Sequence, residues 1–526
     1  VRLDPAILPL VTQLQSYQRS NSSFWQRIRV QFNPGLSRKG PMALHRALPP
    51  PASDQTLRSD PISNIATLHP SALRGEQMML KLRNGFLREV RRGVRASRAT
   101  ADAQLRAAER ACVLSDGAVA RVDVAQLPAN RPIEDFYASA KCISSNAFLF
   151  GVFDGHGGPS CSRHVSSRLF DYICASVLPK HIVVNVPLHE RIQWLFSSAD
   201  PQLSADFQEE HMKNVEEFHR RAKNDSETST VRKALQAAFT ALDDDIAKGA
   251  LPDAQGRVSR SLASVAASGS CAVVAHLRED HIHVANVGDS AAVLGVCNHG
   301  IVSARLLSRP HCIDNTDEVK RLRSAHPIAE STTILRAGRL LGELYPLRAF
   351  GDVRYKWPAE LQKTVLEPLG DTAPQGLLTP PYLTALPEVL YHRLTPNDRF
   401  LVLASDGLWE WLEPDIVVRL ISDHAVGAQT LTAYQPQPGI TLAQVRDELR
   451  QRFAGESKKP LDENSATHVL RHALGGCSGG TETQYRRLTD MLQLPAGMAR
   501  NYRDDITIIV VHFNQSYIES LAYSES

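Results

Sequence analysis

The stretch Phe148-Leu149-Phe150-Gly151-Val152-Phe153-Asp154-Gly155-His156-Gly157-Gly158 carries the strongest structural signal in this chain. Its first six residues form an apolar run that predicts a buried strand, and the run stops at an acid, an imidazole and glycines. Asp154 and the carbonyl of Gly155 offer oxygen ligands of the kind that hard metals prefer, and His156 can donate a proton. Asp-Gly is also a common turn pair, so the stretch alone leaves a polar turn and a functional site equally open.

Composition limits the classes of protein that this chain can represent. The 526 residues are 43% hydrophobic, which is enough to bury a substantial core. The 59 Lys and Arg residues nearly balance the 56 Asp and Glu residues, and this balance does not indicate nucleic-acid binding. No apolar run approaches the roughly 18 residues of a transmembrane helix. The eight cysteines form no Cys-x-x-Cys pair, a pattern typical of reduced thiols in an intracellular protein.

The N-terminal part differs in charge from the rest of the chain. Residues 1–100 contain 16 Lys and Arg residues against 5 Asp and Glu residues, and the chain starts at Val1 without a methionine, as a processed protein or a fragment would. A segment rich in Arg and Ser and poor in acids is typical of a mitochondrial transit or linker region, although a solvated tail has the same composition. We therefore expect residues 1–110 to form a basic extension, with a helix over 76–98.

From about Ala111 the chain alternates between short apolar segments, turns and amphipathic helices. Strands are expected at 148–153, 271–277, 281–287, 291–296, 400–404 and 506–513, and helices at 160–178, at 231–248 and from Pro414. Hairpins without strict βαβ alternation favour an α+β fold with an antiparallel sandwich. This domain is expected to cover 111–513, with loop-rich surface insertions near 180–230, 362–381 and 427–464, and a C-terminal tail at 514–526.

Carboxylates recur at the edges of the expected strands. Asp154, Asp289, Asp406 and Asp504 each lie at such an edge, and Glu134-Asp135 precede the strand-like run 136–143. A single acid of this kind is ordinary turn chemistry. Five in one chain, without clustered cysteines or histidines, indicate an oxygen-lined site for Mg²⁺ or Mn²⁺. Two such ions sharing a carboxylate can hold a phosphate and acidify a water molecule.

The order of these motifs resembles that of the type 2C metal-dependent protein phosphatases over roughly residues 111–513. The motifs are Glu134-Asp135, Asp154-Gly155-His156-Gly157-Gly158, Gly288-Asp289-Ser290, Arg348-Ala349-Phe350-Gly351-Asp352, Asp406-Gly407-Leu408-Trp409 and Asp504-Asp505-Ile506-Thr507. The resemblance implies a four-layer α/β/β/α sandwich with a binuclear metal site at one end. Within the family, the segments 126–130, 380–385, 466–468 and 502–511 are most similar to the mitochondrial pyruvate dehydrogenase phosphatases.

The resemblance also implies a role for each motif residue. Asp154 would bridge two Mg²⁺ or Mn²⁺ ions, with Asp406 and Asp504 on one ion and the Gly155 carbonyl with Glu134 on the other. Asp289 and Glu410 match positions that can support a third, weaker ion. The nucleophile would be water activated by the metals.

Three neighbouring residues receive other roles from the resemblance. His156 matches the general acid that would protonate the leaving serine oxygen, because an imidazole titrates near neutral pH. Asp135 is expected to support the ligands without binding metal, and Asp352 to fix a turn.

The chain departs from the family pattern at two positions. Many members carry a phosphate-binding arginine where this chain has Asn130, and nothing in the sequence shows that Arg131 replaces it. Asp505 stands where the family has asparagine. Because Asp504 and Asp505 alternate sides at a strand start, only one should bind metal, and the motif position favours Asp504.

The leading hypothesis is a metal-dependent phosphoserine phosphatase of the mitochondrial matrix, acting on the pyruvate dehydrogenase α subunit. The resemblance suggests docking to the lipoyl domain of dihydrolipoyl acetyltransferase and association with a regulatory subunit. The alternatives are a type 2C phosphatase with another phosphoprotein substrate and a catalytically dead scaffold. A cysteine nucleophile is disfavoured because no cysteine lies in a phosphate-binding loop that ends in arginine, and Cys271 lies inside an apolar strand.

Overall fold

The computed structural model describes residues 98–177, 190–198, 205–224, 230–425, 439–451, 462–477, 480–495 and 497–524. The basic extension and its expected helix lie outside the described residues, apart from residues 98–110. Among the described residues, no helix combines the length and the apolar character needed to cross a membrane.

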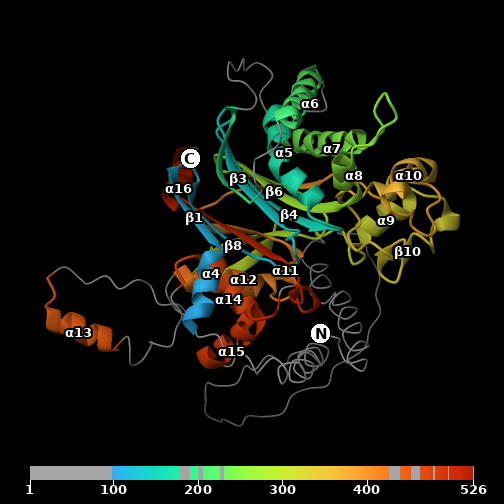
Figure 1. Cartoon of the computed structure of the whole chain (residues 1–526). Coiled ribbons are helices and arrows are strands. Elements are labelled where there is room, and N and C mark those ends of the chain that lie inside the picture. The colour runs from blue at the N-terminus through green and yellow to red at the C-terminus, as the bar shows by residue number, and fades with distance from the viewer. Residues whose placement is uncertain are drawn as a thin grey trace, which may run out of the picture. The chain divides into compact units, whose positions relative to one another are not determined.

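Two antiparallel sheets pack face to face in the described part of the chain (Figure 1). The first has the strand order β1-β2-β15-β14-β8-β9, and the second has the order β13-β7-β6-β4-β3-β5 with the short β12 beside β6. The strands are β1 Glu109–Asp116, β2 Val119–Leu127, β3 Phe136–Cys142, β4 Ala147–His156, β5 Ile192–Ser197, β6 Gly269–Arg278, β7 His281–Val287, β8 Ala291–Asn298, β9 Ile301–Leu306, β12 Phe350–Gly351, β13 Glu388–Arg393, β14 Asp398–Ala404 and β15 Ile506–Phe513.

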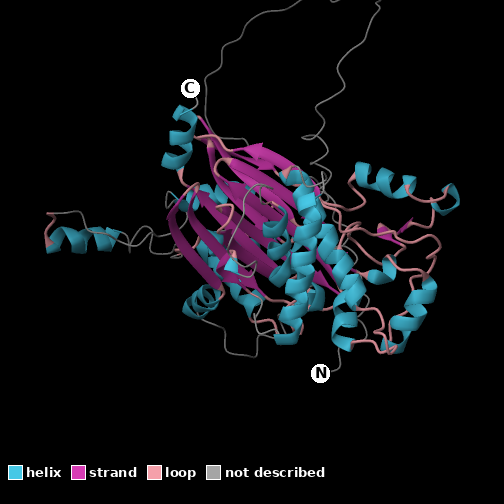
Figure 2. Ribbon diagram, turned by 90° about the horizontal axis from the view of Figure 1, so that it is seen from above, coloured by secondary structure: helices cyan, strands magenta, loops and turns pink. Residues whose placement is uncertain are grey.

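Helices cover the outer face of each sheet, and Figure 2 shows them lying over the strands. The second sheet is covered by α5 Ser160–Ser176, α6 Ala205–Asn224, α7 Val231–Gly249 and α8 Arg260–Ala267. On the side of the first sheet lie α4 Arg98–Ala107, α12 Pro414–Ala425, α14 Ser465–Gly475 and α15 Gly480–Leu492. The remaining elements of this part are α11 Asp406–Trp409, α13 Leu442–Gln451, the 3-10 turn η7 Ala499–Asn501 and α16 Gln515–Ser524. The predicted four-layer α/β/β/α sandwich is confirmed.

The strand β4 is buried on both faces because it lies inside this sandwich. Phe148, Phe150 and Val152 belong to the core between the two sheets, whereas Leu149 and Phe153 belong to the core on the side of α5. Side chains alternate along a strand, so a strand buried on both faces appears in sequence as a continuous apolar run. Gly151 lies beside the ring of Phe153, where an added Cβ would come within 2.7 Å. The quoted stretch therefore forms the centre of the core.

A separate cluster of elements lies between β9 and β13. It contains α9 Thr316–Ser324, the 3-10 turns η3 Ile328–Glu330, η4 Val353–Tyr355 and η5 Glu367–Leu369, the two-residue strands β10 Leu335–Arg336 and β11 Arg339–Leu340, and α10 Ala359–Val365. It has its own small apolar core, which includes Leu322, Leu340 and Tyr382. We call residues 307–387 the side module. The module contributes the motif Arg348-Ala349-Phe350-Gly351-Asp352 to the fold.

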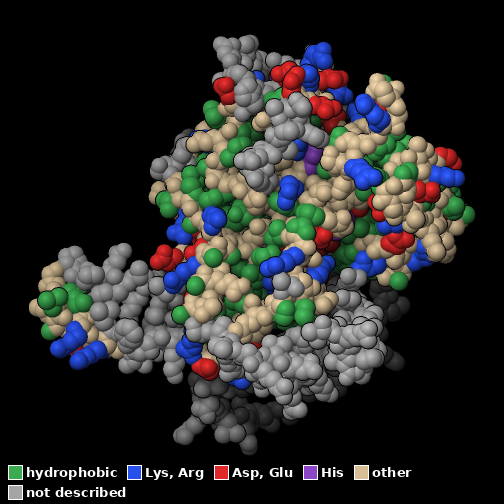
Figure 3. Space-filling view, viewed as in Figure 1, with side chains coloured by type: hydrophobic (Ala, Val, Ile, Leu, Met, Phe, Trp, Pro, Cys, Tyr) green, Lys and Arg blue, Asp and Glu red, His purple; other side chains and the backbone are tan. Residues whose placement is uncertain are grey.

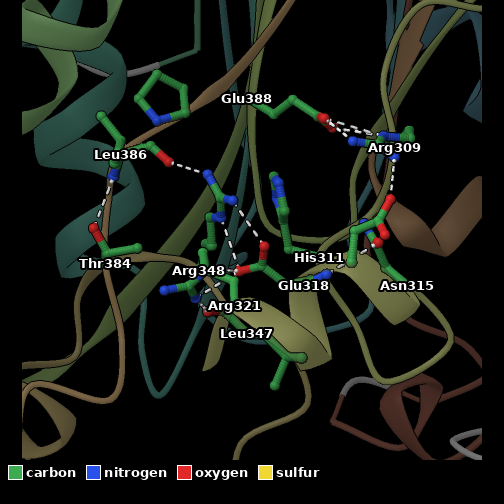
Figure 4. A network of polar contacts seen from close by, with 12 residues as sticks. Arg309, His311, Asn315, Glu318, Arg321, Leu347, Arg348, Thr384, Leu386 and Glu388 are labelled. Atoms are coloured by element: carbon green, nitrogen blue, oxygen red, sulfur yellow. Dashed lines mark hydrogen bonds and ion pairs between the residues drawn. The ribbon is translucent and has the colours of Figure 1, made fainter. Parts of the chain in front are cut away.

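An ionic network holds the side module together (Figure 4). Glu318 on α9 accepts hydrogen bonds from Arg348 Nε at 2.8 Å and Nη2 at 2.7 Å, and from Arg321 Nε at 2.8 Å. Burial by itself would raise the pKa of Glu318, but the bonds from Arg348 and Arg321 lower it to about 2. His311 Nδ1 accepts a bond from the backbone N–H of Gly288, which links the module to the turn that carries Asp289.

Several expectations about the surface segments were wrong in part. The segment 180–230 is not merely a polar insertion, because β5 pairs with β3 and α6 packs on α5 with Val215 and Phe218 buried. The segment 362–381 starts inside α10, and 427–464 contains α13. The tail at 514–526 contains α16, whose Ile518 belongs to the core between the sheets. The elements β5, α6 and α16 are stabilised by neighbours far along the chain, which a local pattern does not show.

The start of the domain also lies earlier than the sequence suggested. The strand β1 begins at Glu109 and pairs with β2, so the expected boundary at 110 falls inside the sheet. Helix α4 precedes it and buries Leu105 fully. Arg98 at the start of α4 pairs with Glu482 on α15.

The network in the side module predicts a pH-dependent loss of stability for Glu318→Gln. The substitution leaves two arginine charges without their buried partner, and we expect the free energy of unfolding at pH 7 to fall by about 3 kcal/mol in urea titrations. The folded-state pKa of Glu318 lies below the ordinary value, so its stabilisation is present above about pH 4 and is lost as the pH falls toward 2. The difference in the free energy of unfolding between Glu318→Gln and wild type should therefore shrink as the pH falls toward 2.

Asp317→Asn is the matched control for this measurement. The Asp317 side chain is 65% exposed and pairs with Arg309 at the surface, so its loss should cost less than about 1 kcal/mol. Equal destabilisation by the two variants would contradict the role given to Glu318.

Candidate metal centre

The predicted carboxylates lie at one end of the two sheets. Asp154 lies near the end of β4, Asp406 follows β14, and Asp289 lies between β7 and β8. Ala404 at the end of β14 pairs with Ala291 at the start of β8, while Asp154 pairs with Cys271 on β6. Oxygen atoms of Asp154, Asp289 and Asp406 lie within 4.8 Å of one another. Antiparallel pairing and sheet stacking thus bring together residues that are more than a hundred positions apart.

Asp289 is buried, Asp154 and Asp406 are half-buried, and their negative charges repel one another. Burial, followed by the charges of Asp406 and Asp135, raises the pKa of Asp154 well above its usual range. The pKa of Asp406 is raised in the same way, with burial first and then Asp289 and Glu410. A divalent cation would relieve this repulsion, and an all-oxygen donor set suits Mg²⁺ or Mn²⁺. The arrangement therefore fits the metal type expected from the sequence.

Glu134 and Gly155 lie next to each other at the same end. Glu134 Oε1 accepts a hydrogen bond from the backbone N–H of Gly158 at 2.8 Å, and its backbone carbonyl accepts one from Ser162 Oγ at 2.5 Å. A Cβ at position 155 would come within 2.3 Å of the Glu134 carbonyl oxygen and 2.4 Å of Ser162 Oγ. Position 155 therefore has no room for a side chain. Close packing accounts for the glycine between Asp154 and His156, and a polar turn is not needed to explain it.

Asp504 and Asp505 share a contact with the Asn130 amide but differ in their main partners. Asp505 is buried, and its two oxygens accept hydrogen bonds from the backbone N–H groups of Ala129, Asn130 and Glu134. It thereby fixes the loop that carries Glu134. Asp504 has a partly exposed side chain that pairs with Arg500, and its charge contributes to the raised pKa values of Asp154 and Glu134.

The remaining predicted residues lie around this group. Asp135 is buried and accepts a hydrogen bond from Thr507 Oγ1 at 2.8 Å, in agreement with a supporting role. Glu410 is exposed at the end of α11, close enough to raise the pKa of Asp406, and it lies outside the group of three closely spaced aspartates.

Asp352 does more than fix a turn, and this is a correction to the sequence interpretation. Its Oδ2 lies 2.5 Å from His156 Nε2. Burial alone would lower the pKa of His156, but the charge of Asp352 and this hydrogen bond outweigh it and raise the pKa. A Cβ on Gly269 would come within 2.0 Å of His156 Nε2 and 2.3 Å of Asp352 Oδ2. The glycine on β6 thus provides the space in which the pair meets.

Sequence reasoning missed three residues near the group. Cys271 lies in the strand core as expected, yet its Sγ donates to Asp289 Oδ1 at 3.1 Å. Burial and the charges of Asp289 and Asp154 raise the pKa of Cys271, which argues against a thiolate nucleophile. Tyr345 of the side module has a raised pKa because of burial and the nearby charges of Cys312 and Asp289. Arg500 is the third, and no local motif distinguishes it.

Comparison with known proteins identifies the class. The family model described as Protein phosphatase 2C matches residues 191–447. The human mitochondrial [Pyruvate dehydrogenase [acetyl-transferring]]-phosphatase 1 is 40% identical over 427 residues, which cover 75% of this chain and 78% of that protein. The human phosphatase 2 of the same name is 40% identical over 420 residues, 76% of this chain and 79% of that protein.

A more distant relative has the same printed name. The phosphatase 1 from Saccharomyces cerevisiae is 30% identical over 444 residues, 76% of this chain and 70% of that protein. The chain therefore belongs to the protein phosphatase 2C family. It is a protein serine/threonine phosphatase.

The repulsion among the aspartates predicts opposite effects of Asp154→Asn with and without metal. In EDTA the variant should unfold about 2–5 °C above wild type, because one of the repelling charges is gone. Added Mn²⁺ should raise the unfolding temperature of wild type and raise that of the variant much less. Differential scanning calorimetry measures both effects.

Asp244→Asn serves as the control, because Asp244 is an exposed acid on α7. It should behave like wild type in both conditions. An Asp154→Asn protein that is less stable in EDTA and gains as much from Mn²⁺ as wild type would contradict the metal centre.

Proposed function

We propose that this chain is a Mg²⁺- or Mn²⁺-dependent phosphatase that removes phosphate from serine on the pyruvate dehydrogenase α subunit and so reactivates that complex. The observation that carries the proposal is the convergence of Asp154, Asp289 and Asp406 at one end of a sandwich whose relatives bear the name of that activity. The mitochondrial names of these relatives and the basic N-terminal composition support a location in the mitochondrial matrix.

The proposed ligands divide between the two sheets. Asp154, Asp406, Asp504, Glu134 and the Gly155 carbonyl would hold two divalent ions, and Asp289 with Glu410 would support a third. When bound, these ions supply Lewis acidity that activates water and offsets the charge of the phosphate. Asp505 holds the backbone of the loop that carries Glu134, and Asp135 accepts a hydrogen bond from the Thr507 hydroxyl on β15.

His156 is the proposed proton donor to the leaving serine oxygen. Its Nε2 is engaged by Asp352, so Nδ1 is the nitrogen that remains for the substrate. The carboxylate fixes the orientation of the ring and stabilises its protonated form. Asp352 thus acts as a positioning residue through His156.

Partner binding follows from the same resemblance. The lipoyl domain of dihydrolipoyl acetyltransferase and a regulatory subunit are the proposed partners. On the face drawn in Figure 3, acidic and basic side chains of the described residues are interspersed.

The test of the substrate is dephosphorylation of the phosphorylated pyruvate dehydrogenase complex by the purified chain. We expect phosphate release that needs Mg²⁺ or Mn²⁺, stops in EDTA, and is faster when the acetyltransferase core is present. Asp154→Asn should reduce release to background.

The controls separate the proposal from its alternatives. Release from an unrelated phosphoserine protein at the same rate would favour a phosphatase with another substrate. Release that survives exhaustive chelation would contradict metal dependence, and no release from any phosphoprotein would leave only a scaffold.

Asp352→Asn should slow hydrolysis selectively for substrates with poor leaving groups. A serine oxygen needs protonation as it leaves, whereas p-nitrophenolate does not. We expect kcat/KM to fall by about 10²-fold on a phosphoserine peptide and by less than about 3-fold on p-nitrophenyl phosphate. In a His156→Gln background the same substitution should have no further effect, and equal losses on both substrates would argue for a general folding defect.

A further inference from the structure

The proposed centre must admit an anion into a group of acids. A phosphoserine carries a charge of about −1.5 to −2 near neutral pH, and the carboxylates of Asp154, Asp406 and Asp504 repel it wherever metal does not offset them. A fixed cation beside these acids would lower that barrier and orient the phosphate. The guanidinium group suits this role because its N–H donors can bind two phosphate oxygens side by side.

Three residues near the Glu134 loop are poorly placed for this role. The Asn130 amide donates to Asp505 Oδ2 at 3.0 Å and to Asp504 Oδ1 at 3.4 Å, so it is occupied by protein oxygens. Arg131 is exposed. Arg503 is 4% exposed and donates to the carbonyls of Leu127 and Pro128, which makes it a structural clamp between β2 and β15.

Arg339 of the side module also lies near the acids, but it is held by its own module. Its charge lowers the pKa of Asp289. Its guanidinium lies over the ring of Tyr345, 5.7 Å from the ring centre, and Nη1 donates to the Glu343 carbonyl at 2.7 Å. Its geometry therefore serves the packing of the module.

Arg500 lies in a different setting. It is part of the turn η7, four residues before Asp504, and its Nη1 pairs with Asp504 Oδ2. Its side chain is 43% exposed, so the group faces solvent as well as the acids. Burial alone would lower its pKa, but the charges of Asp504, Asp406, Asp154 and Glu410 raise it. The guanidinium therefore contacts Asp504 and lies within the electrostatic range of acids from both sheets.

The contact with Asp504 leaves part of the guanidinium available. The pair engages Nη1, whereas an arginine has five N–H donors arranged in a planar fork. Asp504 is also a proposed metal ligand, so an ion bound there would compete with Arg500 for the same carboxylate. The Arg500 guanidinium would then be able to bind an anion next to Asp504.

We propose that Arg500 is the residue that binds the phosphate of the substrate, and of the released product, at this centre. This inference rests on the proposed function. It assigns the phosphate-binding role, which Asn130 does not fill, to a residue from the turn before β15. In this chain one short segment would supply both a metal ligand, Asp504, and a phosphate ligand, Arg500.

The test compares Arg500→Met and Arg500→Lys with wild type in the full chain. The inhibition constant of inorganic phosphate against p-nitrophenyl phosphate hydrolysis should rise on the order of 10- to 100-fold in Arg500→Met. Arg500→Lys keeps the positive charge and loses the planar, forked arrangement of N–H donors. Its inhibition constant for phosphate should therefore lie between those of wild type and Arg500→Met. Arg131→Ala is the matched control and should match wild type.

A second readout separates this role from simple neutralisation of Asp504. Calorimetric titration with Mn²⁺ should give unchanged or tighter binding in Arg500→Met, because a cation beside the metal ligands has been removed. Unchanged phosphate inhibition, or a rise that also appears in Arg131→Ala, would overturn the proposal. The proposal would also be overturned if Arg500→Met bound Mn²⁺ more weakly and this weaker binding accounted for the whole rise in the phosphate inhibition constant.

Failure of the proposed function would look different. If wild type showed no activity on phosphoserine proteins, phosphate binding to the Mn²⁺-loaded protein could still be measured by calorimetry. Loss of that binding in Arg500→Met would support the assignment even then, and its retention would overturn it.

Discussion

The repulsion among buried carboxylates is the constraint on which the rest of this structure depends. Asp154, Asp289 and Asp406 bring oxygen atoms within 4.8 Å of one another in a largely desolvated place. Such a group is unfavourable by itself, as the raised pKa values of Asp154 and Asp406 indicate. It persists because the strands that carry it are fixed by a large apolar core between the two sheets.

The same core explains why the centre can be rigid. The strand β4 is packed on one face against the other sheet and on the opposite face against α5. A ligand at the end of such a strand has little freedom, so its carboxylate is held where the metal needs it. Glycines complete the arrangement where backbones or rings must approach closely, as Gly155 does beside Glu134 and Gly269 does beside His156.

The side module contributes to the candidate site as well as to the size of the fold. Its ionic network around Glu318 fixes Arg348. His311 of the same module accepts a hydrogen bond from the backbone N–H of Gly288, in the turn that carries Asp289. Asp352, also in the module, lies against His156. The side module therefore contacts both the turn that carries a candidate ligand and the candidate proton donor.

The sequence by itself determined the sandwich, the core strands and the set of acids, because each of these leaves a local pattern of apolar alternation or of carboxylates at strand edges. Strands β6, β7 and β15 and helices α5 and α7 follow directly from such patterns. Only the tertiary structure decided what depends on distant partners: the pairing of His156 with Asp352, the hydrogen bonds that make Asp505 a loop clamp, and the effect on Arg500 of the charges of acids from both sheets. The segment 180–230 and the C-terminal residues show the same limit, since β5 and α16 are stabilised by neighbours far along the chain rather than by a strong local period. Periodicity can be recognised within a single segment, whereas packing depends on contacts between segments that are distant in the sequence.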